Sequence, residues 1–144
     1  MSLFNAMNVS ASGMTAQQLR TDIISQNIAN VNTTRGADGK PYVRKTVVFE
    51  EKDTRSFSGV LKNVLASSNG VKVTKIVEDT DTPMRKVYDP SHPDADEDGY
   101  VSYPNVDTVT EMTNLIDSSR AYEANITCFN GAKAMESKAL EIGK

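Results

Sequence analysis

The residues best suited to chemistry form an acidic loop, Asp94-Ala95-Asp96-Glu97-Asp98-Gly99. Acidic side chains at its first, third and fifth positions, with glycine at the sixth, match the first half of a calcium-binding loop. The twelfth position is Asn105 rather than a glutamate that would bind calcium through two oxygens, and Pro90 and Pro93 exclude an entering helix. We therefore favour a solvated acidic turn, keep weak calcium binding as the alternative, and assign no metal ligands.

Nucleophilic catalysis has only isolated candidates in this sequence. His92, the single histidine, lies in a predicted loop, and Cys128, the single cysteine, falls near the seam of a predicted helix. A Ser–His–Asp or Cys–His arrangement can be drawn, but no spacing brings such side chains together. The sequence also has no G-x-G-x-x-G, P-loop or H-E-x-x-H motif. We expect an exposed loop histidine, a small buried helical cysteine, no cofactor and no enzymatic activity.

The composition of the 144 residues argues against two further classes of protein. A net charge of −3 argues against a dedicated nucleic-acid-binding domain, since such domains are usually basic. The longest apolar runs have three residues, as in Val47-Val48-Phe49, whereas a membrane-spanning helix needs about 20 apolar residues. The first residues carry neither the basic nor the apolar region of a secretory signal, so we expect no cleaved signal peptide.

The first of two predicted helical arms covers residues 1–34. Its only charged residues are Arg20 and Asp22, and apolar residues recur at helical spacing over about residues 3–32. They form two stripes, which predicts burial on more than one side of the helix. One stripe holds Leu3, Met7, Met14, Ile24, Ile28 and Val31, and the other holds Val9, Ala16, Leu19 and Ile23.

The second arm covers residues 105–144, with a helix predicted from about residue 105 to 142. Asn105 or Asp107 is expected to cap the helix after Pro104. Its apolar seam alternates steps of three and four residues, as in a coiled coil. The seam comprises Met112, Leu115, Ser119, Tyr122, Ile126, Phe129, Lys133, Glu136 and Leu140, and Val109 and Ile116 flank it.

The middle segment, residues 35–104, holds most of the glycines and prolines and is predicted to form short strands and turns. The expected strands cover Tyr42–Phe49, Val71–Val77, Met84–Tyr88 and Tyr100–Tyr103. Together these elements predict an α+β fold. The long terminal helices pack as an antiparallel coiled-coil-like pair, beside a small, mainly β middle domain.

Several blocks of the sequence resemble the bacterial flagellar axial proteins, which form the rod, the hook and related structures. Residues 25–33, Ser-Gln-Asn-Ile-Ala-Asn-Val-Asn-Thr, are similar to the N-terminal motif of that family. Residues 39–49, 89–106 and 111–133 narrow the resemblance to rod proteins of the proximal-rod C type. Thr33-Thr34-Arg35 stands where other axial proteins often carry Thr-Pro-Gly, as expected of this subfamily.

This resemblance implies a structural subunit of the flagellar basal-body rod. Such subunits assemble with copies of themselves and other rod proteins into a hollow helical shaft, which transmits motor torque and surrounds the export channel. It further implies export by the flagellar type III apparatus without a cleaved signal peptide. The implied location is the rod outside the cytoplasm, in the periplasm or cell-wall zone, with contacts to the adapter region of the rotor ring.

We expect the assembly interface to lie on the two arms, because one chain cannot cover all of their apolar stripes. The alternatives are another axial rod or hook paralogue, or a coiled-coil interaction module with a weak calcium-binding loop. The interface is assigned to Leu3, Met7, Met14, Ile24, Asn27, Ile28, Asn30, Val31, Met112, Leu115, Tyr122, Ile126, Phe129 and Leu140.

Overall fold

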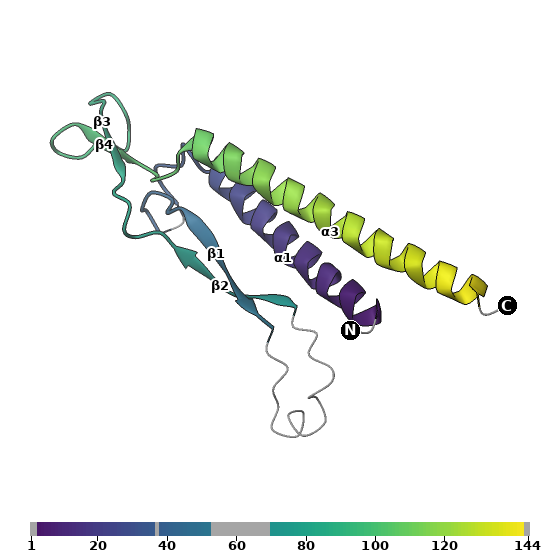
Figure 1. Ribbon diagram of the computed structural model, residues 1–144. Helices are drawn as coiled ribbons and strands as arrows, with labels where there is room; N and C mark the ends of the chain where they lie inside the picture. Colours follow the sequence, from purple (N-terminus) through teal and green to yellow (C-terminus); the bar gives the residue numbers. More distant parts are fainter. Residues whose placement is uncertain (1–2, 37, 53–69, 143–144) are drawn as a thin grey trace, which may run out of the picture.

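The computed structural model describes residues 3–36, 38–52 and 70–142, and for Leu3 the backbone alone. Two long terminal helices pack together, and the short antiparallel strands between them in the sequence lie beside and beyond the pair, which confirms the predicted α+β fold (Figure 1). In chain order the elements are α1 (Leu3–Ala29), β1 (Lys45–Glu51), β2 (Val71–Glu78), β3 (Arg85–Tyr88), β4 (Tyr100–Tyr103) and α3 (Thr108–Ile142).

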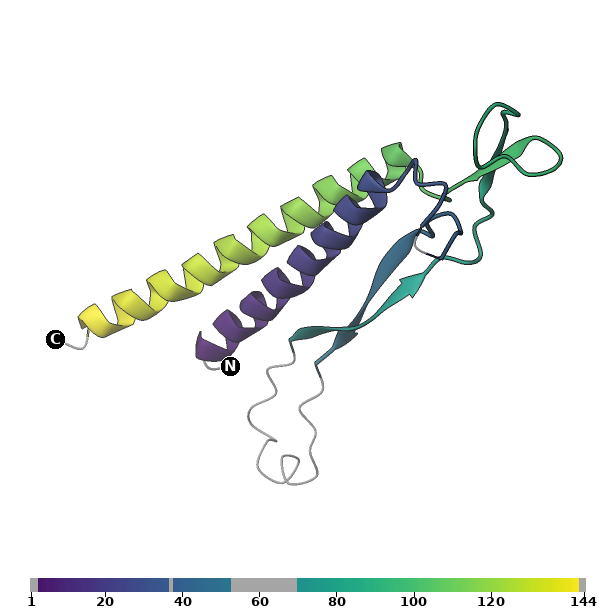
Figure 2. The ribbon, with the colours of Figure 1, turned by 180° about the vertical axis from the view of Figure 1, so that it is seen from behind.

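The two helices pack side by side and run antiparallel, as predicted, so the two ends of the chain lie at the same end of the pair (Figures 1 and 2). Because α3 has 35 residues and α1 has 27, α3 extends past the start of α1. The other side of α1 packs against β1 and β2, so α1 lies between α3 and this hairpin.

Side-chain hydrogen bonds explain where the helices end. Asn30 donates from its side-chain amide to the Gln26 carbonyl, 2.8 Å away, and α1 ends at Ala29 rather than at the expected residue 32. Asp107 caps α3, because its carboxylate accepts hydrogen bonds from the backbone N–H and the hydroxyl of Thr110. These hydrogen bonds lower the pKa of Asp107. Of the two expected caps, Asp107 is therefore correct and Asn105 is not.

The strands form two separate two-stranded sheets. β1 pairs antiparallel with β2 and contains a register shift between Val48 and Phe49, and β3 pairs antiparallel with β4. β1 begins at Lys45 rather than at Tyr42, since Tyr42 donates its backbone N–H to Thr33 and lies outside the ladder. The β3–β4 hairpin projects beyond the end of the helix pair where α1 ends and α3 begins (Figure 1).

Polar residues make up a large share of the buried residues in the described chain. The buried apolar side chains are Ala16, Ile23, Ile24, Val101, Val106 and Ala132. The buried polar side chains are Ser10, Asn27, Asn105, Glu111 and Ser118. Buried polar groups must find partners to offset their lost hydration, so these residues should have specific positions in the fold.

Candidate functional site: a polar junction and exposed apolar surfaces

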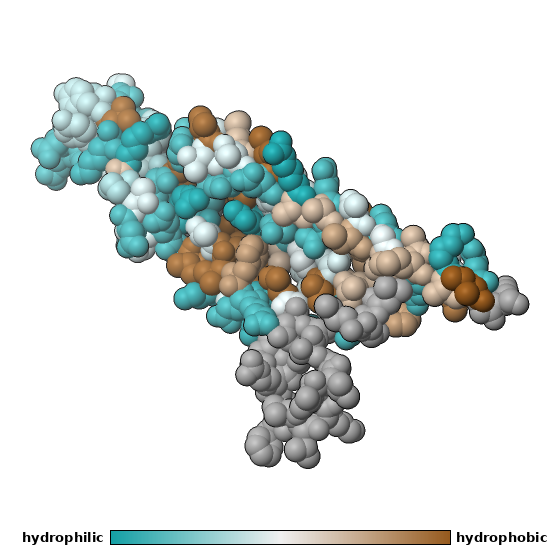
Figure 3. Space-filling view, viewed as in Figure 1, coloured by the Kyte–Doolittle hydropathy of each residue, from teal (hydrophilic) through white to brown (hydrophobic). Residues whose placement is uncertain are grey.

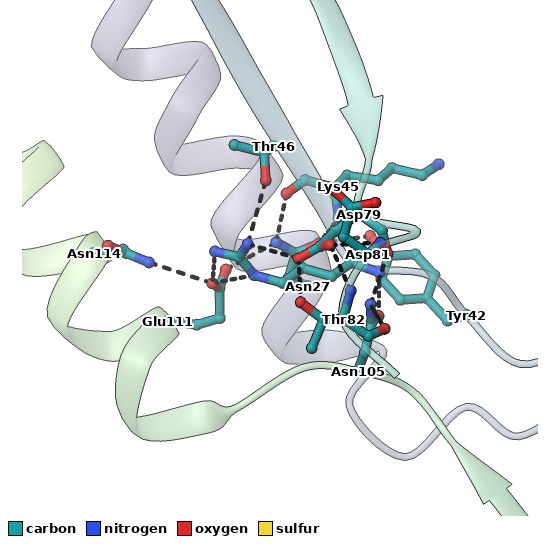
Figure 4. Close-up of polar contacts among 11 residues, drawn as sticks. Asn27, Tyr42, Lys45, Thr46, Asp79, Asp81, Thr82, Asn105, Glu111 and Asn114 are labelled. Atoms are coloured by element: carbon teal, nitrogen blue, oxygen red, sulfur yellow. Dashed lines mark hydrogen bonds and ion pairs between the residues drawn. The ribbon is translucent and has the colours of Figure 1, made fainter. Parts of the chain in front are cut away.

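A network of hydrogen bonds joins both helices to the β segments where the arms meet. We call it the junction and define it by Asn27, Tyr42, Arg44, Asn105 and Glu111 (Figure 4). Asn27 comes from the last turns of α1, and Glu111 comes from the first turn of α3. Tyr42 and Arg44 precede β1, and Asn105 lies between β4 and α3.

Glu111 is the buried charge at the centre of the junction, with 1% of its surface exposed. Its Oε1 accepts hydrogen bonds from Arg44 Nη2 at 2.8 Å and Nε at 3.0 Å. Its Oε2 accepts from Asn27 Nδ2 at 2.8 Å, and Asn114 adds a contact at 3.3 Å. A buried carboxylate is tolerated when it is paired and hydrogen-bonded, so Glu111 depends on both α1 and the segment before β1.

Asn27 is completely buried and uses its whole amide group. Its Nδ2 donates to the Lys45 carbonyl at 2.9 Å and to Glu111, while its Oδ1 accepts from the Lys45 N–H and the Tyr42 hydroxyl, both at 2.9 Å. The amide therefore pairs with the first residue of β1 much as a neighbouring strand would. Burial, followed by the charges of Glu111 and Glu78, raises the pKa of Tyr42, which keeps its hydroxyl a donor.

Asn105 fixes the chain between the second hairpin and α3. Its Oδ1 accepts the Arg44 N–H at 2.9 Å, and its Nδ2 donates to the carbonyls of Asp79 and Thr82 at 2.7 and 3.1 Å. Asp79 also lies 3.5 Å from Arg44 Nη1. Hydrogen bonds from Thr82, ahead of the Arg44 charge, lower the pKa of Asp79. The junction thus holds four segments of the chain in one arrangement.

The seam between α1 and α3 consists largely of small and polar residues. The hydroxyls of Thr21 and Ser118 lie 2.8 Å apart, and Ser118 donates to the Gln17 carbonyl at 3.0 Å. A Cβ on Gly13 would lie 2.7 Å from Oδ1 of Asn125, so glycine is what allows the close approach there. Small residues let the two helix backbones pack closely. Several large apolar side chains of α3, among them Val109, Met112 and Ile116, are therefore left exposed outside the seam.

The predicted seam of α3 is partly wrong. From Glu111 to the end of α3, the buried or half-buried residues are Glu111, Asn114, Leu115, Ser118, Ala121, Tyr122, Asn125, Ile126, Phe129, Ala132 and Glu136. Leu115, Tyr122, Ile126, Phe129 and Glu136 were predicted, whereas the expected seam positions of Met112, Ser119, Lys133 and Leu140 are exposed. The physical reason is that Gly13, Gln17 and Thr21 of α1 are small or polar and face Ser118 and Asn125 of α3.

The residues assigned to the assembly interface occupy different environments. Ile24 and Asn27 are buried, and Met112 and Leu140 are 51% and 71% exposed. The side chain of Leu3 lies outside the described residues. Intermediate exposure is found for Met7, Met14, Ile28, Asn30, Val31, Leu115, Tyr122, Ile126 and Phe129. Their role in assembly remains a prediction.

Sequence reasoning missed most of the junction and placed Val109 and Ile116 only as flanking residues. These two side chains are 73% and 54% exposed and lie with Met112 on one face of α3. We call Val109, Met112 and Ile116 the α3 stripe. Figure 3 shows apolar surface over the start of α3. Large exposed apolar patches commonly mark interaction sites.

The acidic loop uses its carboxylates to shape a turn. Asp94 pairs with Arg35 at 2.7 Å and accepts the Thr34 hydroxyl at 2.8 Å. Asp96 accepts the backbone N–H of Tyr100 at 2.7 Å, and Gly99 has a φ of 79°, a conformation that favours glycine. Across the residues that the structure describes, no group of three or more acidic, histidine or cysteine side chains could hold a metal ion.

His92 and Cys128 differ from expectation. His92 is half-buried rather than exposed, because its ring lies 6.5 Å from that of Tyr103 and its Nδ1 accepts the Asp94 N–H. Cys128 is exposed rather than buried, since the seam passes through Asn125 and Phe129 and leaves it on the flank.

In the described part of the chain, no helix is long and apolar enough to cross a membrane.

Comparison with known proteins finds relatives that match this chain over all or nearly all of its length. The family model described as "Flagella basal body rod protein" matches residues 7–37, and "Flagellar basal body rod FlgEFG protein C-terminal" matches residues 97–142. The chain is 49% identical to the flagellar basal-body rod protein FlgC of Bacillus subtilis over the full length of both. It is 43% identical to that of Borreliella burgdorferi, covering 99% of this chain and 98% of the relative. It is 38% identical to that of Escherichia coli O6:H1 over the full length of both.

Proposed function

Because the chain belongs to the FlgC family of flagellar basal-body rod proteins, we propose that it is a structural subunit of the proximal rod. In this proposal it assembles with copies of itself and other axial proteins into a hollow helical shaft. The shaft surrounds the export channel and transmits torque through its rigidity, without chemistry of its own.

The observation that carries this proposal is the mismatch between the seam and the surface of the helix pair. Small and polar side chains make up much of the seam, while the α3 stripe and, at the free end of α3, Leu140 and Ile142 are more than half exposed. Each large apolar side chain that becomes buried contributes about 1.5–3 kcal/mol. Assembly would supply the covering surface that one chain lacks.

We place the subunit in the rod outside the cytoplasm, exported by the flagellar type III apparatus and kept without cleavage. Its neighbours would be other rod proteins, further copies and the adapter region of the rotor ring. The assigned interface residues on both arms, with the α3 stripe added, would form the contacts within the shaft.

Deletion and complementation test the proposal. Cells that lack this chain should lose motility and complete rods, and the wild-type chain should restore both. The double variant His92→Asn/Cys128→Ser should restore them equally well, because a structural subunit needs no nucleophile. Normal rods in the deletion strain would overturn the proposal, and selective failure of a well-folded double variant would favour an enzymatic role instead.

A further inference from the structure

We infer that Asp94 is a positioning residue, which fixes the direction of the β3–β4 hairpin relative to the helix pair. Little else holds this hairpin. Among the described residues, neither β3 nor β4 packs against a helix or against the β1–β2 hairpin. All four residues of β3 are exposed, and in β4 only Val101 is buried. Because the hairpin projects from the end of the pair (Figure 1), its direction depends on the segments that connect the elements.

The first point of attachment is Asn105, at the base of the hairpin. Its amide donates to the carbonyls of Asp79 and Thr82 in the segment that enters the hairpin, whereas Asn105 itself belongs to the segment that leaves it. Its Oδ1 accepts the Arg44 N–H and so joins the base to the junction. One attachment at the base would leave a projecting hairpin free to swing about that point, so its direction requires a second attachment.

The second point of attachment is Asp94, in the loop between β3 and β4. Its Oδ2 accepts the Thr34 hydroxyl at 2.8 Å, and its Oδ1 lies 2.7 Å from Arg35 Nη2. Thr34 and Arg35 belong to the segment between α1 and β1, so both carboxylate oxygens reach a different part of the chain. In the part of the chain that the structure describes, no other hydrogen bond or ion pair from residues 89–99 reaches outside the hairpin and its loop.

The fold of the loop places Asp94 opposite these partners. The Asp94 N–H donates to His92 Nδ1 at 3.1 Å, and the His92 ring lies 6.5 Å from that of Tyr103 in β4. Hydrogen bonds to a carboxylate are short and strong because the acceptor is charged. However, the Arg35 side chain is 64% exposed, and an ion pair at the surface adds little to stability. Asp94 should therefore control the direction of the hairpin rather than the stability of the fold.

The consequence for the rod rests on the proposed function. A subunit can transmit torque through its rigidity only if its projecting parts move together with its helices. With Asn105 and Asp94 both in place, the β3–β4 hairpin forms one body with the junction. Without Asp94 the hairpin would swing about its base. Asp94 thus gives the acidic loop a mechanical role that needs no bound cation.

Distances between two spin labels on the full chain test this role. One label is attached to the native Cys128, exposed on α3, and the other to Lys86→Cys, exposed on β3. We expect a narrow distribution of distances that becomes about twofold wider with Asp94→Ala, since a single remaining attachment acts as a hinge. Asp98→Ala is the matched control, because it removes an exposed carboxylate from the same loop, and it should leave the width unchanged. A distribution as narrow with Asp94→Ala as with this control overturns the inference.

Variants on the partner side give an independent check. Thr34→Val combined with Arg35→Gln should widen the distribution as much as Asp94→Ala does, and all three changes together should widen it no further, because they remove the same contact. The urea midpoint of each variant should stay close to that of the wild type. Additive widening, or loss of folding with Asp94→Ala, would contradict a positioning role. Either result leaves the proposed function intact, because the deletion strain tests that function separately.

Discussion

Glu111 joins three segments of the chain at the centre of the junction. It receives Arg44 from before β1 and Asn27 from α1 while staying on α3, so three segments share one carboxylate. A buried ion pair adds little net stability by itself, but removing one partner is costly because the other is left unpaired. The junction therefore acts mainly to specify where the two arms and the first hairpin meet.

Replacing Glu111 with glutamine tests this role. Both carboxylate oxygens of Glu111 accept hydrogen bonds, so the side-chain NH₂ of the glutamine would face an N–H donor of Arg44 or Asn27. The Arg44 guanidinium would also lose its counter-charge. We expect the free energy of unfolding to fall by about 3 kcal/mol, measured by urea denaturation of the monomer. Glu123→Gln, an exposed change on the same helix, should stay within about 0.5 kcal/mol. Equal effects of the two substitutions would contradict the account.

At the scale of elements, close packing of α1 and α3 depends on small side chains. Gly13 faces Asn125 across the seam, whereas an added Cβ on Gly131 of α3 would meet no atom within 4 Å. The two glycines are both inside helices, yet only Gly13 is needed for the approach of the two backbones. The same substitution should therefore have different consequences at the two positions.

Gly131→Ala should raise the free energy of unfolding by about 0.5–1 kcal/mol, because alanine favours the helix. Gly13→Ala should not show this gain, since the alanine Cβ would displace the Asn125 side chain. Asn125 would then lose its 2.8 Å hydrogen bond to the Ala121 carbonyl. In an Asn125→Ala background, Gly13→Ala should recover the gain. Denaturation of these variants measures all three values, and an equal gain at both glycines in the wild-type background would argue against a tight seam.

The elements themselves were predictable because their signals are strong. Helical periodicity and Pro104 indicated α3, and the charge-poor stripes indicated α1. The seam was not predictable, since positions 111, 115, 118 and 122 alternate four and three just as regularly as 112, 115, 119 and 122. Only the polar face of α1 decides between them. Likewise, Glu111 looked like an ordinary acidic residue of a first helical turn, and nothing near it in the sequence pointed to Arg44.

At the scale of the whole molecule, the chain has two polar contact regions inside and apolar surface outside. The junction and the seam hold the arms in place, while apolar side chains remain exposed at both ends of α3. Phe4, at the start of α1, is also 60% exposed and lies near the free end of the helix pair. A molecule built in this way has its arms aligned before assembly and its apolar surface available for neighbours.

A three-dimensional reconstruction of the intact basal body is the most direct test of the central claim that this chain is a rod subunit covered by neighbouring subunits. The account predicts that the chain is found in the rod wall, with α1 and α3 antiparallel and with Val109, Met112 and Ile116 covered by an adjacent subunit. A rod without this chain, or a rod in which the α3 stripe faces solvent in every copy, would contradict it.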